Sequence, residues 1–164
     1  MARLWARTAT FESISVGDTL PILVKWETRD TINGFTALLS PGDLPGDLPS
    51  DTPEGPEARP GVDPVEPDAA AGPFAPAQAL LAYVTELLEK AFPVPNLMAQ
   101  GSRLELELLS PVRPEDTISL TGRVVGKSED AAASGLSRRL VECEVLIDNQ
   151  EGQAIARAQA VVAW

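Results

Sequence analysis

The sequence contains no histidine, and this absence limits its chemistry more than any other feature of the composition. The single cysteine, Cys143, cannot form an intramolecular disulfide. Without histidine or a second thiol the chain also has no zinc-type ligand set. We therefore expect a reducing cytoplasm, no metal and no cofactor.

Positive charge is scarce as well. The chain has 13 lysines and arginines against 24 aspartates and glutamates, which gives a net charge of -11. Proteins that bind nucleic acids or anionic membranes do so through lysines and arginines that outweigh the carboxylates. This chain has the opposite balance, so neither partner is expected. No apolar run approaches the length of a membrane span, and residues 1–10 contain no signal-peptide core. Small molecules and proteins remain as candidate ligands.

The length of 164 residues and the apolar content of 44% predict one domain, 1–164, around one core. The acidic residues are unevenly distributed along this domain. Residues 41–73 contain eight carboxylates, one arginine and nine prolines, so they can form neither a long helix nor a central strand. We interpret this segment as an insertion, and two roles stay open for it: a passive excursion of the chain or a lid over a site.

Periodicity predicts one strand and two helices around this insertion. The β-prone run from Thr19 to Trp26 indicates the strand, and a short amphipathic helix should follow Thr28 and end before Pro41. A longer helix is predicted from Pro76 to Phe92. Its apolar residues recur at helical spacing: Leu80, Leu81, Val84, Leu87, Leu88 and Ala91.

From Arg103 onward the residues alternate between apolar and polar, which predicts four consecutive antiparallel strands. In the first of them Leu104, Leu106 and Leu108 should form the buried face. A hairpin loop is expected at 149–152. The predicted fold class is α+β, with an antiparallel sheet wrapped around the long central helix.

Two stretches of sequence carry a family resemblance. They are RLELELLSPVRPEDTISLTGRVVGK at 103–127 and RRLVECEVLIDNQEGQAIARAQAVVAW at 138–164. Both resemble the MaoC-like dehydratases, most specifically in SPVRPEDT from Ser110 to Thr117. The resemblance implies a hotdog fold and a dimer whose two sheets join edge to edge. It also implies a site for a coenzyme A or acyl-carrier thioester near the dimer interface.

The (R)-specific enoyl-CoA hydratases of this family carry a Gly-Asp, Asn-Pro and His pattern after the short helix. Gly42 and Asp43 match its start, so the resemblance makes Asp43 the candidate catalytic residue. Leu48 stands where the histidine should be. Hydration requires one group to activate water and another to deliver a proton, so hydratase or dehydratase (lyase) chemistry is in doubt. The alternative is that Asp43 is a solvated loop carboxylate.

Similarity to the family also implies that a backbone N–H at the start of the central helix polarises the thioester carbonyl. Ala77 and Gln78 are the candidates here, with an ordinary first helical turn as the alternative. Arg113 and Arg123 are the first candidates to bind the phosphates of coenzyme A. For Arg123 the alternative is cross-strand pairing with a glutamate.

Three functions remain open at this point. The chain binds an acyl-CoA or related acyl thioester, alone as a homodimer or as a heterodimer with another hotdog subunit. It is a thioesterase that uses a carboxylate, with Asp43, Glu86 or Glu89 as the available bases. Or it is a structural or regulatory dimer without catalysis. Cys143 and Tyr83 are expected to pack in the core.

Overall fold

The structure, a computed structural model, describes residues 1–39, 73–131 and 137–164. Nearly all of the predicted insertion, including Asp43 and Leu48, lies outside these residues.

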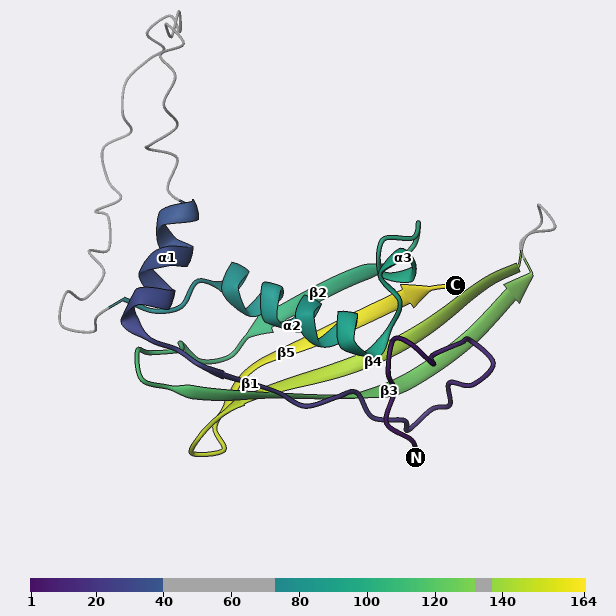
Figure 1. The fold of residues 1–164 in the computed structure, drawn as a ribbon, viewed down its shortest axis with the longest axis horizontal. Helices are drawn as coiled ribbons and strands as arrows, with labels where there is room; N and C mark the ends of the chain where they lie inside the picture. Colours follow the sequence, from purple (N-terminus) through teal and green to yellow (C-terminus); the bar gives the residue numbers. More distant parts are fainter. Residues whose placement is uncertain (40–72, 132–136) are drawn as a thin grey trace, which may run out of the picture.

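The centre of the fold is helix α2, Ala77–Ala91, which lies along the sheet (Figure 1). Proline residues frame it, with Pro76 at its N-cap and Pro93 two residues beyond its last turn. The residues predicted to face the sheet are buried: Leu80, Val84, Leu87 and Leu88. The predicted central helix is therefore confirmed. No helix of the described part of the chain is long and apolar enough to span a membrane.

The described residues contain five antiparallel strands that form one sheet, in the order β1-β3-β4-β5-β2. The strands are β1 Leu23–Trp26, β2 Arg103–Leu108, β3 Thr117–Ala131, β4 Ser137–Asn149 and β5 Ala154–Ala163. The predicted fold class is confirmed, but the prediction of four strands paired in chain order is wrong at one point. Strand β2 pairs with β5, not with β3, and β1 takes the place beside β3. One strand from each half of the chain therefore closes each side of the sheet around α2.

The concave face of the sheet carries the rest of the core. Strands β3 and β4 contribute large apolar residues, whereas β5 contributes alanines, which leave room for the helix. The inward residues are Ile118, Leu120, Val124, Val141, Cys143, Val145, Ile147, Ala156, Ala158 and Ala160. The predicted loop after β4 is confirmed as a turn in which Gly152 has a φ of +76°.

The predicted leucine face of β2 is only partly buried. Leu104 and Leu106 are half-buried against the core, and Leu108 is 48% exposed. The expectation of a fully buried face was wrong because β2 is an edge strand with a paired neighbour on one side alone among the described residues. The leucine side chains of this edge strand therefore remain partly accessible to solvent.

Two shorter helices, α1 and α3, complete the described part of the fold. Helix α1, Arg29–Leu39, follows β1 and lies beside the N-terminal end of α2 (Figure 1). The Thr28 hydroxyl accepts a hydrogen bond from the Thr31 N–H at 3.1 Å, which confirms the predicted N-cap. Helix α3, Val94–Leu97, follows Pro93 and was not predicted from the sequence.

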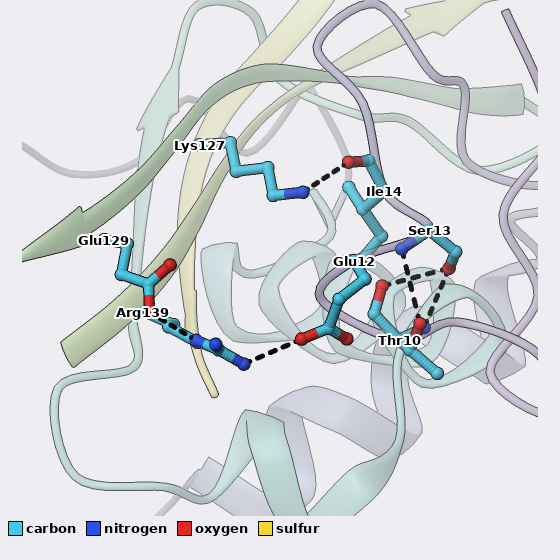
Figure 2. Close-up of polar contacts among 7 residues, drawn as sticks. All are labelled: Thr10, Glu12, Ser13, Ile14, Lys127, Glu129 and Arg139. Carbon is cyan, nitrogen blue, oxygen red and sulfur yellow. Dashed lines mark hydrogen bonds and ion pairs between the residues drawn. The ribbon is translucent and has the colours of Figure 1, made fainter. Parts of the chain in front are cut away.

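Residues 11–14 of the N-terminal segment contact strands β3 and β4 around residues 127–139 (Figure 2). Arg139 pairs with Glu12 at 2.8 Å and with Glu129 at 2.9 Å. Lys127 donates a hydrogen bond to the Ile14 carbonyl at 2.8 Å, and both cations lie over the ring of Phe11. These basic residues therefore hold the N-terminal segment in place.

The burial of Leu87 in α2 predicts the effect of shortening its side chain. The Leu87→Ala substitution should lower the free energy of unfolding by about 2–5 kcal/mol, because it removes buried methyl groups and leaves a cavity. Leu38→Ala on α1 is the matched control, since Leu38 is 83% exposed and its loss should be within about 0.5 kcal/mol. Urea denaturation measures both. A loss below about 1 kcal/mol for Leu87→Ala would contradict the assigned core.

Candidate functional site

The N-terminal end of α2 presents two backbone donors that meet no acceptor in the part of the chain that the structure describes. Pro76 occupies the N-cap in an extended conformation and supplies no side-chain cap. Within the described residues, no acceptor meets the N–H of Ala77 or Gln78, whereas the Ala79 N–H bonds the Pro76 carbonyl at 2.9 Å. Ala77 is half-buried and Gln78 is exposed. Free N–H groups at a helix start attract a carbonyl oxygen or an anion.

The turn at 111–116 brings Arg113 to this helix end. The Ala75 N–H, just before α2, donates to the Val112 carbonyl at 3.0 Å. The turn itself is closed by the Arg113 N–H, which donates to the Asp116 carboxylate at 2.8 Å. The Arg113 side chain is exposed, and no ion-pair partner for it occurs in the described ranges. The backbone of this turn therefore lies next to the segment that enters α2, while the Arg113 side chain lines an open depression with residues 149–153.

Arg123, the other predicted phosphate ligand, is placed elsewhere. It points outward from β3 and pairs with Glu144 of β4 at 3.0 Å. Its neighbour Val124 faces inward and is buried, so Arg123 lies on the side of the sheet opposite α2. The Ala75–Val112 hydrogen bond joins the segment before α2 to the turn that carries Arg113, whereas Arg123 lies on the other side of the sheet.

A buried carboxylate, Glu27, lies at the same end of the fold and was not predicted. Leu23 and Lys25 of β1 face α2, and the strand alternation carries Glu27 to that face as well. Glu27 is fully buried, and neither of its carboxylate oxygens has a hydrogen-bond partner within the described residues. Its burial raises the pKa of the Glu27 carboxyl above the ordinary value, while the nearby Tyr83 hydroxyl and the charge of Lys25 act in the opposite direction.

The turn that carries Arg113 also holds the backbone of Glu27. The Glu27 N–H donates to the Asp116 carbonyl at 2.8 Å, and the Glu115 N–H donates to the Glu27 carbonyl at 2.6 Å. Glu115 has a φ of +73°, a left-handed conformation that is uncommon outside glycine. Such backbone strain persists where the surrounding structure enforces it, often at functional sites. One strained turn thus fixes both Glu27 and the entry to α2.

Tyr83 connects α2 to the neighbouring elements. Phe35 of α1 packs edge-on against its ring at 5.9 Å between centroids, and the Lys25 ammonium lies 5.0 Å from the ring centroid. Burial and then Glu27 raise the pKa of Tyr83, which keeps the hydroxyl protonated at neutral pH. The expected packing role of Tyr83 is observed in its contact with Phe35.

The two helical glutamates considered as bases have different surroundings. Glu86 pairs with Lys25 at 2.5 Å and with Lys90 at 3.0 Å, and these hydrogen bonds lower the pKa of Glu86. Glu89 lines an open depression of about 530 Å³ near Trp5, toward the C-terminal end of α2. Neither glutamate lies at the free N–H groups of the first turn.

Cys143 is buried in the core, as expected. Burial raises the pKa of its thiol to about 12, so it is a poor nucleophile at neutral pH. Within the described ranges no cluster of three or more histidine, cysteine, aspartate or glutamate side chains is arranged to hold a metal ion.

The unpartnered carboxylate predicts an unusual pH dependence. Because the pKa of Glu27 is raised in the folded state, its stabilising contribution is complete below the ordinary value of 4.5 and is lost as the pH rises through the folded pKa. Glu27→Gln should therefore raise the free energy of unfolding at pH ~8, by about 1–3 kcal/mol, and this gain should shrink toward pH ~4.5.

Glu86→Gln is the matched control, and the predicted effect of pH on the stability contribution of Glu86 is the opposite of that for Glu27. Its pKa is lowered by its lysine partners, so its contribution is present above the ordinary value and is lost as the pH falls. Glu86→Gln should leave the protein less stable or unchanged at pH ~8. Denaturant titrations across this pH range measure both variants, and a Glu27→Gln protein that is less stable than the parent at pH ~8 would contradict the assigned environment.

Comparison with known proteins identifies the fold. The sequence matches no family model and no curated protein. An (R)-hydratase from A. caviae involved in PHA biosynthesis aligns with a TM-score of 0.60 and 20% identity, over 92% of this chain and 97% of that one. A MaoC-like dehydratase from Rhodospirillum rubrum aligns with a TM-score of 0.60 and 22% identity, over 93% of each chain.

A third similar structure is the ChsH1-ChsH2 complex from Mycobacterium tuberculosis. It aligns with a TM-score of 0.55 and 17% identity, over 90% of this chain and 96% of that one. These alignments cover nearly the whole chain at low identity, so they show a shared fold. The chain has the hotdog fold of the MaoC-like dehydratases and (R)-hydratases, as its sequence predicts.

Proposed function

We propose that this chain binds an acyl thioester, acyl-CoA or a related carrier-bound form, at the N-terminal end of α2. The observation that carries the proposal is the pair of N–H groups at Ala77 and Gln78, which meet no acceptor among residues 1–39, 73–131 and 137–164, in a fold shared with an (R)-hydratase. Two N–H donors at a helix start suit the carbonyl oxygen of a thioester, because that oxygen is partly negative and the helix end is positive.

Arg113 supports the same proposal from the neighbouring turn. Coenzyme A and phosphopantetheine both carry phosphate, which a guanidinium binds with charge-assisted hydrogen bonds. In a chain with a net charge of -11, a cation that has no carboxylate partner among the described residues should attract such a ligand. Arg113 is a better candidate than Arg123, whose guanidinium is paired with Glu144.

The proposal does not include hydration of an enoyl thioester. With no histidine in the sequence, the chain lacks the second proton-transfer group that the resemblance would require. Crotonyl-CoA and longer trans-2-enoyl-CoA substrates should therefore bind without being hydrated.

Binding is best measured by calorimetry with a non-hydrolysable S-alkyl thioether of coenzyme A. Arg113→Ala should weaken its affinity by about 1.5–3 kcal/mol, as expected for a lost hydrogen bond to a charged group. Arg123→Ala is the matched control and should change affinity by less than about 1 kcal/mol, because an exposed ion pair contributes little. Absence of binding by the unmodified protein, or rapid hydration of crotonyl-CoA, would contradict the proposal.

We further propose that the protein works as a dimer, with a second copy or another hotdog subunit. The free edge of β2 and its half-exposed leucines support this, because an unpaired edge with apolar side chains favours pairing. The similar ChsH1-ChsH2 structure is itself a complex.

Light scattering at micromolar concentration should show a dimer of this chain, or a monomer that dimerises when its partner subunit is added. Leu108→Glu should weaken the assembly, because Leu108 is exposed at the β2 edge. Leu38→Glu, a similar change on exposed α1, should not. A protein that stays monomeric alone and with every co-purified hotdog subunit would contradict the dimer.

A further inference from the structure

We infer that a depression beside the C-terminal end of α2 binds an adenine nucleotide, with the base stacked on Trp5 and the phosphate held by Arg7. The depression has a volume of about 530 Å³, and its walls include Trp5, Arg7, Glu89 and Lys90. It lies at the opposite end of α2 from the N–H groups of the first turn, so this nucleotide site is independent of the proposed thioester site.

A tight turn holds Trp5 at the surface, where the N-terminal segment passes beside α2 (Figure 1). The Trp5 carbonyl accepts a hydrogen bond from the Ala9 N–H at 2.9 Å. The Ala6 N–H donates to the Lys90 carbonyl at 2.9 Å, which joins the turn to the last turn of α2. Leu4 and Ala9 are buried on either side of the turn, whereas Trp5 is 51% exposed. The backbone around Trp5 is therefore fixed while its indole ring stays accessible.

An accessible indole on a fixed backbone suits a planar ligand. A large aromatic side chain left in solvent forgoes the free energy of burial, and stacking against another ring recovers it. Because the backbone of the turn is already ordered, little conformational entropy is lost when a ring stacks on Trp5. The volume of the depression also lies within the range of small-molecule sites, which is about 300–1,000 Å³.

Arg7 supplies the cation for a phosphate at the edge of this depression. Arg7 is exposed, and no carboxylate of the described residues pairs with it. Lys90 lines the same depression, but its ammonium already bonds the Glu86 carboxylate at 3.0 Å. A guanidinium also binds phosphate through two parallel charge-assisted hydrogen bonds, which an ammonium cannot form. The phosphate is therefore assigned to Arg7.

Glu89 selects the base. A carboxylate accepts hydrogen bonds and donates none. The 6-amino group of adenine is a donor, whereas the 6-oxo group of hypoxanthine is an acceptor, so a carboxylate beside the base favours adenine. Glu89 is exposed on the wall of the depression and has no ion-pair partner within residues 1–39, 73–131 and 137–164. A stacking ring, a phosphate ligand and an acceptor for an amino group thus surround one space.

The first test is calorimetric titration of the full chain with AMP and with IMP, which differ in the group at position 6 of the base. The unmodified protein should bind AMP, and it should bind IMP more weakly by about 10-fold or more, because two acceptors would then face each other. Glu89→Gln should remove this preference, since a glutamine amide both donates and accepts.

The second test removes the stacking ring. Trp5→Ala should weaken AMP binding by about 5–150-fold, the effect of losing one base–aromatic stack, and Trp5→Phe should retain part of the affinity. Trp26→Ala is the matched control, because Trp26 is 62% exposed but belongs to β1. Its affinity for AMP should stay within about 3-fold of the parent.

The third test removes the cation. Arg7→Ala should weaken AMP binding by about 10–100-fold, as expected for lost hydrogen bonds to a charged group. Arg29→Ala is the matched control, since Arg29 is an exposed arginine at the start of α1, and its effect should stay within about 3-fold.

Competition distinguishes two sources of the nucleotide. If the S-alkyl thioether of coenzyme A displaces AMP and Trp5→Ala weakens both, the nucleotide portion of coenzyme A occupies the depression. If AMP binds whether or not the thioether is present, the occupant is a free nucleotide. Either result supports the site.

Three results would overturn the nucleotide site: no AMP binding at millimolar concentration, equal affinities for AMP and IMP, or unchanged AMP affinity in Trp5→Ala. Failure of the thioether to bind while AMP binds would contradict the thioester proposal alone and would support the free nucleotide as the occupant.

Discussion

The packing of α2 into the concave face of the sheet is the constraint on which the other parts depend. Its apolar face buries Leu80, Val84 and Leu87, and the alanines of β5 make room for it. Because both sides of the sheet must reach around this helix, β1 and β2 take the two edges, one from each half of the chain. The helix start is consequently held where β1, α1 and the turn at 111–116 meet, so the same packing that stabilises the domain also assembles the candidate site.

Much of this architecture could be predicted from the sequence because periodicity reports burial directly. The helix at Pro76–Phe92 and the strands from Arg103 onward follow from spacing alone. Strand order does not, since alternation fixes which face of β2 is apolar but not which strand lies beside it. The half-exposed leucines of β2 have the same origin: a sequence cannot distinguish an edge strand from a central one when both alternate.

The candidate site could be predicted only in part. The resemblance indicated the start of α2 and Arg113, and one backbone hydrogen bond, from Ala75 to Val112, joins the segments that carry them. It also indicated Arg123, which lies across the sheet. Glu27 was missed although the signal was present, since the alternation of Leu23 and Lys25 continues inward to Glu27. That inward position was overlooked because a glutamate at a strand end is ordinarily read as the beginning of a solvated loop.

The burial of Glu27 links the stability of the core to proton concentration. Protonation of Glu27 removes the buried charge and stabilises the fold, whereas protonation of Glu86 weakens its pairs with Lys25 and Lys90. The two carboxyls therefore act on stability in opposite directions as the pH changes, one from the core and one from the surface of α2. The pH of greatest stability reflects a balance between them, and a substitution at either residue should shift it.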